Sequence, residues 1–294
     1  MEQGADLTRT QRGPNAVPVR FVDTPTRTVA AAGVRFVYRE LGNGHDGVPL
    51  VGLTHLGANL DSWDPEVVDA LAEGRRVILI GYRGVGASTG SVQGRFEDMA
   101  KDMISVVRVL GWSRVDVLGL SMGGMVAQEI LRQAPQLVER VILAGTGPQG
   151  GPGLTEMTRV MVRNILRGVI TFTPATTLLF FTRTSTGRQA AKAYRARIKQ
   201  RRAGRDNPVT PAVFRAQLRA VNLWGQRQPG ANTFTGPALI LHGDSDRMVP
   251  VENVVPLLAR FPHAGVRVFA DSGHGVVPQN RHAVTHIIER FLRR

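Results

Sequence analysis

Short apolar runs alternate along this chain with longer segments of helical periodicity. The apolar runs are bounded by turn-forming residues and cover 49–54, 76–80, 115–120 and 141–144. Between them, apolar residues recur every three or four positions, as in 96–110. Runs of this length are typical of strands that are buried on both faces, and the intervening segments are typical of amphipathic helices. The pattern predicts a mostly parallel sheet flanked by helices, an α/β class of fold.

The N-terminal part has a different character. Residues 1–27 are rich in Thr, Pro, Gly and Arg and show no periodicity, which predicts a flexible N-terminal arm. Two strand-like runs follow at 29–31 and 35–41, separated by Ala32-Gly33, and together they predict a β-hairpin.

The alternation of strands and helices stops after residue 147, where a Gly- and Pro-rich stretch begins. Helical signals then follow one another at 155–167, 173–181, 186–203 and 210–225. Strand signals return at 237–242 and 266–269, and a closing helix is predicted at 283–292. We therefore expect a core formed by residues 28–147 and 232–294, with a helical lid, residues 148–231, inserted after the sixth strand.

Most of the positive charge lies in this predicted lid. The formal net charge is +14, and residues 151–235 hold fifteen Arg and Lys against two acids, which is +13. Such a patch could attract nucleic acid, anionic lipid or acidic substrates. No nucleic-acid motif or interleaved aromatic series accompanies it, so no nucleic-acid partner is expected and a solvated basic face is favoured. The alternative is that some of these arginines point inward and bind a carboxylate on the substrate.

Composition excludes several classes of protein. The chain has no cysteine, which rules out disulfides, thiolate catalysis and cysteine-based metal sites. No apolar run reaches the ~18 residues that indicate a membrane span. The first residues lack a basic start followed by an apolar core, so no signal peptide is expected and the predicted location is cytoplasmic. Neither a cofactor nor a metal ion is expected.

The segment 115–124 carries the main candidate for chemistry. Gly119, Ser121 and Gly123 form a G-x-S-x-G pattern between an apolar strand and a helix that is predicted to begin near Met122. In a nucleophile elbow the strand turns into the helix so tightly that larger side chains at the glycine positions would collide. The turn exposes the serine hydroxyl, and the helix N-terminus is suited to stabilise an oxyanion. Ser121 is therefore the candidate nucleophile.

A serine nucleophile needs a base, and that base needs a carboxylate that orients it. Two strand-end loops after Ser121 supply them in the order acid then histidine, with Asp246 and His274 as candidates. Asp244 is the alternative to Asp246. Asp246 is preferred as the catalytic acid, and one of the two is expected to order the turn through hydrogen bonds to its own backbone. Five other histidines are interpreted as structural: His55, His242, His263, His282 and His286.

An oxyanion hole needs two N–H donors. The N–H of Met122, directly after the serine, is the first candidate. The loop after the strand at 49–54 can supply the second, for which Leu56 is preferred and Gly57 is the alternative. His55 is expected to shape this loop and not to react.

Taken together, these motifs resemble those of α/β-hydrolase-fold serine hydrolases from about residue 29 to the end, with the lid least similar. The matching segments are 119–124 (GLSMGG), 83–88 (RGVGAS), 242–250 (HGDSDRMVP) and 272–275 (SGHG). The loop 54–57 (THLG) is similar to that of 3-oxoadipate enol-lactonase-like and cofactor-free haloperoxidase-like esterases, whose residue at the Leu56 position supplies an oxyanion N–H.

Three positions refine this resemblance. Thr54-His55 stands where those members commonly have His-Gly, and Gly81 stands where an aspartate is common before the Arg-Gly-x-Gly loop. Neither departure removes a catalytic group. Ser121 occupies the position where epoxide hydrolases and dehalogenases usually carry Asp, so those reactions are disfavoured.

The resemblance implies hydrolysis of a carboxylic ester, lactone or thioester through an acyl-enzyme, with a small-molecule acyl substrate. One alternative keeps the same three residues for C–C bond hydrolysis or perhydrolysis. Another is a non-catalytic ligand-binding protein with this fold, and a third is a nucleic-acid or membrane-surface binder that uses the basic lid. The sequence leaves the formation of a homo-oligomer open.

Overall fold

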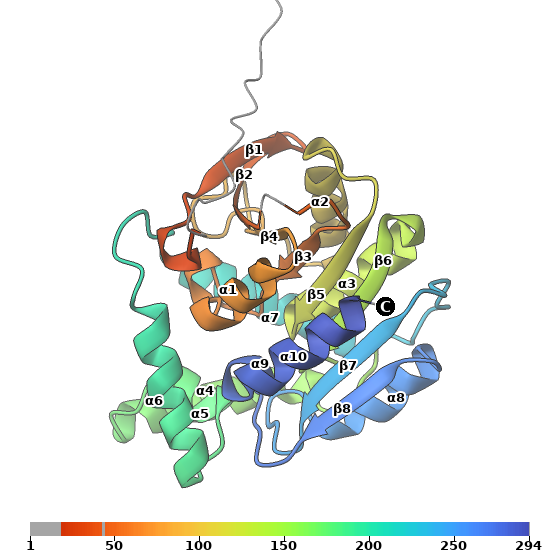
Figure 1. The fold of residues 1–294 in the computed structure, drawn as a ribbon. Coiled ribbons are helices and arrows are strands. Elements are labelled where there is room, and N and C mark those ends of the chain that lie inside the picture. The colour runs from red at the N-terminus through yellow and green to blue at the C-terminus, as the bar shows by residue number, and fades with distance from the viewer. Residues whose placement is uncertain (1–18, 43–44, 294) are drawn as a thin grey trace, which may run out of the picture.

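The computed structural model describes residues 19–42 and 45–293, so most of the predicted N-terminal arm lies outside the described residues. Within them, eight strands form one sheet in the order β1-β2-β4-β3-β5-β6-β7-β8 (Figure 1). Strands β1 and β2 form the predicted hairpin, β2 pairs antiparallel with β4, and the other pairs are parallel. The strand bounds are β1 (Arg27–Ala31), β2 (Val34–Leu41), β3 (Leu50–Leu53), β4 (Val77–Ile80), β5 (Val115–Leu120), β6 (Val138–Ala144), β7 (Ala238–Gly243) and β8 (Gly265–Phe269).

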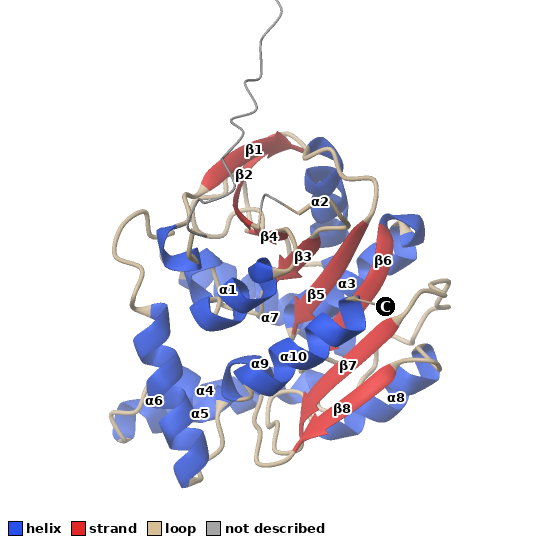
Figure 2. Cartoon of the chain, viewed as in Figure 1, coloured by secondary structure: helices blue, strands red, loops and turns tan. Residues whose placement is uncertain are grey.

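Helices cover both faces of this sheet (Figure 2). One layer contains α2 (Phe96–Val109), α3 (Met122–Gln133) and α8 (Val254–Arg260), and the other contains α1 (Pro65–Glu73), α9 (Val276–Gln279) and α10 (Arg281–Leu292). Successive side chains of a strand point to opposite faces of the sheet, so the core has one part on each face. Val117 packs toward α3, whereas its neighbour Leu118 packs toward α10. The apolar runs of the sequence are therefore strands buried on both faces, and the predicted mostly parallel sheet flanked by helices is confirmed.

Four helices lie between β6 and β7, where the sequence predicts a lid: α4 (Met157–Ile170), α5 (Ala175–Phe180), α6 (Ser185–Ile198) and α7 (Pro211–Gly225). The third was expected to continue to residue 203, but α6 ends at Ile198. After it the chain turns back, and the Arg201 guanidinium donates to the carbonyl oxygen of Gly204 across this turn. In the described part of the chain, no helix is both long enough and apolar enough to cross a membrane.

Several residues of the predicted lid attach α6 and the segment after it to the core. Arg197 forms a buried ion pair with Asp64, at 2.6 Å, next to the start of α1. Arg201 donates to the carbonyl oxygens of Phe21, Val22 and Thr24, so it holds the first described residues against the lid. These arginines therefore do not belong to a solvated basic face, because their charges are used inside the protein.

Breaking the Arg197–Asp64 pair is expected to destabilise the fold. Arg197→Ala should lower the free energy of unfolding by roughly 3 kcal/mol, because it leaves the buried Asp64 carboxylate without its cation. The measurement is urea unfolding followed by circular dichroism. Lys192→Ala, an exposed residue on the same helix, is the control and should change the stability by less than about 0.5 kcal/mol. Equal stabilities of the two variants would contradict the prediction.

Candidate active site

The turn from β5 into α3 places Ser121 in a strained backbone conformation. Its φ and ψ are 52° and −114°, which is unusual for a residue with a side chain. Glycines on both sides allow the turn: a Cβ on Gly119 would lie 2.6 Å from the carbonyl oxygen of Gly123, and one on Gly123 would collide with the carbonyl oxygen of Leu53. The predicted steric reason for the G-x-S-x-G pattern is therefore present in the structure.

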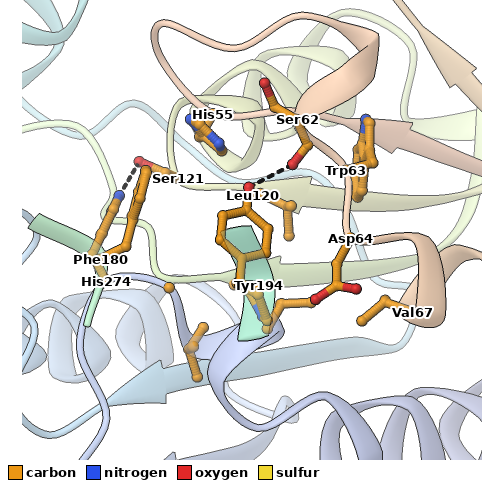
Figure 3. Close-up of a pocket in the computed structure, with 15 residues that line it drawn as sticks. His55, Ser62, Trp63, Asp64, Val67, Leu120, Ser121, Phe180, Tyr194 and His274 are labelled. Atoms are coloured by element: carbon orange, nitrogen blue, oxygen red, sulfur yellow. Dashed lines mark hydrogen bonds between the residues drawn. The ribbon is translucent and has the colours of Figure 1, made fainter. Parts of the chain in front are cut away.

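A continuous hydrogen-bonded chain joins Ser121, His274 and Asp246. The Ser121 Oγ lies 2.8 Å from His274 Nε2, and His274 Nδ1 lies 2.7 Å from Asp246 Oδ2 (Figure 3 shows the first contact). With the proton on Nδ1, His274 donates to Asp246 and accepts from the serine hydroxyl. All three residues are buried, and the sheet brings them together from the ends of β5, β7 and β8.

The two aspartates of the loop after β7 have different partners. Asp246 contacts His274, and its Oδ1 accepts from the N–H groups of Met248 and Val249 at 2.8 and 2.9 Å. Asp244 instead accepts from the backbone N–H groups that precede His274, at Asp271 and Ser272. Asp244 thus orders the histidine loop, and Asp246 is the carboxylate that touches the histidine.

The two predicted oxyanion donors lie on separate segments next to Ser121. Met122 is the first residue of α3, and such an N–H has no acceptor within its own helix. In the loop after β3, the Gly57 N–H donates to Gln217 Oε1 at 2.8 Å, so this alternative donor is already engaged. Among the described residues, Leu56 N–H has no hydrogen-bond acceptor. This difference favours Leu56 over Gly57 as the second donor.

A largely apolar pocket opens beside the Ser121 hydroxyl (Figure 3). Tyr194 of α6 reaches this pocket and donates through its hydroxyl to the Ser62 carbonyl oxygen at 2.8 Å. No lysine or arginine lines the pocket among the described residues, so the predicted carboxylate-binding arginine receives no support here. Apolar side chains form most of its wall: Trp63, Val67, Leu120, Phe180, Val276 and Val277.

Phe180, at the end of α5, covers the histidine of the hydrogen-bonded chain. Its ring is stacked on that of His274 with 5.3 Å between centroids and 9° between planes, and it forms a T-shaped contact with the His55 ring at 4.8 Å between centroids. The Phe180 carbonyl also accepts from the Gly275 N–H at 2.7 Å. Sequence reasoning missed Phe180 as a site residue. The apolar run 178–181 indicated a helix, but no local signal indicated contact with a histidine 94 positions later.

His55 lines the same pocket without joining the hydrogen-bonded chain. Burial lowers its pKa to about 4, against a hydrogen bond to the Leu56 carbonyl oxygen that favours the charged form. His55 is therefore neutral at pH 7. Burial also lowers the pKa of His242, whose Nδ1 lies 3.2 Å from the Gly243 carbonyl oxygen. The burial and the lowered pKa of His55 and His242 agree with the interpretation of these histidines as structural.

These lowered pKa values predict a loss of stability in mild acid. Because the unfolded state binds protons more readily than the folded state, the free energy of unfolding should fall as the pH falls from about 6.5 to 4. His55 should contribute about 3 kcal/mol of this loss. Urea unfolding at four pH values should show a shallower pH dependence for His55→Gln than for wild type. Exposed His263→Gln is the control, and a slope unchanged by His55→Gln would refute the assignment.

Comparison with known proteins tests the family assignment. Residues 49–280 match the family described as the alpha/beta hydrolase fold. The chain belongs to this family. An uncharacterised protein of Mycobacterium tuberculosis is 30% identical over 306 residues, covering 96% of this chain and 86% of its own length. The solved structure of an alpha/beta hydrolase fold protein from Chitinophaga pinensis is 27% identical, with a TM-score of 0.88 over 93% of this chain and 98% of that chain.

Two further matches have names that state an activity. A poly(3-hydroxyalkanoate) depolymerase of Ectopseudomonas oleovorans is 26% identical, covering 83% of this chain and 84% of its own length. The enol-lactonase of Burkholderia xenovorans LB400 shares the fold, with 21% identity and a TM-score of 0.71 over 91% of this chain and 100% of that chain. The chain is a hydrolytic enzyme of this family, as the sequence motifs predicted.

Proposed function

We propose that this α/β hydrolase cleaves a carboxylic ester, lactone or thioester through an acyl-enzyme on Ser121. The observation that supports this proposal is the hydrogen-bonded chain from Ser121 Oγ through His274 to Asp246, with contacts of 2.8 and 2.7 Å. The serine hydroxyl of this chain lines an apolar pocket. A hydroxyl that already donates to an imidazole can lose its proton as it attacks a carbonyl carbon.

In the acylation step, the Ser121 Oγ forms a bond to the substrate carbonyl carbon, and its proton passes to His274 Nε2. Asp246 stabilises the resulting imidazolium through the Nδ1–H contact. The carbonyl oxygen gains the negative charge, and the N–H groups of Met122 and Leu56 stabilise it. The C–O or C–S bond of the substrate then breaks, and the leaving group takes the proton from Nε2.

In the deacylation step, a water molecule attacks the acyl carbon while His274 Nε2 accepts a proton from it. The bond between the acyl carbon and Ser121 Oγ breaks, and the serine regains a proton from the imidazolium. The products are a carboxylic acid and the free enzyme. Phe180 covers one face of the His274 ring, so it limits contact between the imidazolium and solvent during both steps.

The pocket favours an uncharged, largely apolar acyl group. Its wall is formed mainly by aliphatic and aromatic side chains, and the carboxylate that lines it, Asp64, is already neutralised by Arg197. The relatives support carboxylic esters and lactones as the class, since a poly(3-hydroxyalkanoate) is a polyester and an enol-lactone is a cyclic ester. Within this class, neutral acyl chains should be better substrates than chains that end in a carboxylate.

A fluorophosphonate probe followed by intact-mass spectrometry tests the activated serine directly. We expect the wild-type mass to increase by one probe unit, and this labelling to be slowed by a p-nitrophenyl ester or a lactone that occupies the site. Product analysis should then find acid and alcohol. Formation of a peracid in the presence of peroxide would indicate perhydrolysis as the reaction. Cleavage of a C–C bond in preference to an ester bond would indicate C–C bond hydrolysis. A folded protein that is not labelled would refute the proposed function.

A further inference from the structure

Helix α4 of the lid has two apolar faces, of which only one packs against the protein. Its buried face consists of Met157, Met161, Asn164 and Gly168. A second series at helical spacing, 162, 165, 166, 169 and 170, points into solvent and is between 39% and 78% exposed. A single exposed aliphatic residue is ordinary, but a whole apolar stripe on a solvent-facing helix indicates an interaction surface.

Phe172 extends this stripe beyond the end of α4. Its side chain is 96% exposed, and its backbone has a positive φ of 51°. Hydrogen bonds from the N–H groups of Thr171 and Phe172 to the carbonyl oxygens of Arg167 and Val169 close the turn that presents it. We call the residues Val162, Ile165, Leu166, Val169, Ile170 and Phe172 the α4 outer face.

Arginines border the α4 outer face. Arg163 and Arg167 lie one turn apart on the helix, and neither has an acidic partner among the described residues. Arg183 is exposed in the segment between α5 and α6, and desolvation and then the charges of Arg247, Arg167 and Arg163 lower the pKa of its guanidinium. The two acids of the lid do not offset this charge: Glu156 pairs with Arg159, and Asp206 accepts from backbone N–H groups of the core.

We propose that the α4 outer face and its bordering arginines dock on an anionic lipid surface. Aliphatic side chains and an exposed phenylalanine can insert at the boundary of head groups and acyl chains, while the arginines contact anionic head groups. Figure 1 shows α4, α5 and α6 together at the lower left of the molecule. The surface lies outside the proposed catalytic chain of Ser121, Asp246 and His274.

Charge argues for this occupant against the other candidates. A second copy of the chain would bring the same arginines toward each other, in a protein whose net charge is +14. The phosphates of a nucleic acid could pair with the arginines. The aliphatic side chains, however, offer no stacking platform for bases and make no favourable contact with phosphates. Of these three candidate partners, an anionic lipid surface is the one that can contact both the apolar side chains and the positive charges favourably.

Sedimentation with lipid vesicles tests the proposal and uses no enzymatic activity. Vesicles of phosphatidylcholine with 30% phosphatidylglycerol, roughly the charge density of an anionic leaflet, are compared with pure phosphatidylcholine. Wild type should bind the anionic vesicles more tightly, and added salt should weaken this binding. Ile170→Ser with Phe172→Ser should reduce the partition coefficient about tenfold or more. Replacing Arg163, Arg167 and Arg183 by Gln should reduce it on the order of 100-fold.

Matched controls separate the α4 outer face from general surface properties. Val109→Ser with Val255→Ser removes two exposed apolar residues from other helices. Replacing Arg35, Arg108 and Arg290 by Gln removes three exposed charges outside the lid. Both controls should bind like wild type. The proposal is overturned if wild type does not sediment with anionic vesicles, or if each control weakens binding as much as its counterpart on α4.

Two further results would assign the surface to another partner. A wild-type dimer in analytical ultracentrifugation that dissociates in the variant Ile170→Ser with Phe172→Ser would indicate a second copy. Retention on duplex DNA that exceeds vesicle binding and persists in that variant would indicate nucleic acid. Either result overturns the lipid proposal.

Discussion

Ser121→Ala is expected to abolish labelling by a fluorophosphonate and to lower kcat for ester hydrolysis by on the order of 10⁵-fold or more. The substitution removes the atom that would form the acyl-enzyme and leaves the oxyanion donors and the pocket in place. Alanine also fits the space, since it is smaller than serine and keeps the β5–α3 turn. The measurements are the rate of hydrolysis of a p-nitrophenyl ester and the detection of fluorophosphonate labelling by intact-mass spectrometry.

A second serine in the same pocket provides the control for this variant. Ser62 lines the pocket, and its carbonyl oxygen binds the Tyr194 hydroxyl. Ser62→Ala should keep both labelling and most of the activity, because its hydroxyl has no histidine partner among the described residues. Unchanged labelling of Ser121→Ala, or labelling lost only in Ser62→Ala, would show that Ser121 is not the nucleophile.

Asp246→Asn is expected to lower kcat by about 10⁴-fold with little change in KM. Asparagine has nearly the same shape, and its side-chain oxygen can still accept from the Met248 and Val249 N–H groups, so the loop should remain folded. It cannot stabilise the His274 imidazolium as a carboxylate does, and its NH₂ group can hold the neutral ring in the wrong tautomer. The measurement is steady-state kinetics of ester hydrolysis across pH.

Asp244→Asn is the matched control, since Asp244 lies in the same loop two positions away. Its carboxylate accepts from the N–H groups of Asp271 and Ser272 and does not contact His274. This change should reduce kcat by less than about tenfold, as expected for a residue that acts through loop position alone. A loss in Asp244→Asn as large as in Asp246→Asn would contradict the different roles that we propose for them.

The order of strands and helices, the turn at Ser121 and the loop of His274 could be predicted from the sequence. Each has a local physical cause that a short segment carries by itself. Apolar runs such as 115–120 require burial on both faces, helical spacing requires one buried side, and Gly119 and Gly123 leave room for a turn that other residues would block. The topology of a mostly parallel sheet then brings the ends of its strands to one edge.

Other features depended on contacts between distant segments. Asp246 was preferred over Asp244 from the sequence, but the contact of Asp246 with His274, and that of Asp244 with the backbone at Asp271, come from the tertiary structure. Gly57 and Leu56 are both plausible donors until Gln217, 160 residues later, occupies the Gly57 N–H.

The predicted lid, residues 148–231, shows most clearly what the tertiary structure alone decided. Its sequence has a uniform basic character, yet Arg197 is buried against Asp64 while Arg163 and Arg167 face solvent beside an apolar stripe. Phe180 reaches His274 through the packing of α5 on the core. Charge and periodicity determine that such helices form. The direction in which each long side chain points depends on the partner that the rest of the chain supplies, and spacing along the sequence does not encode that partner.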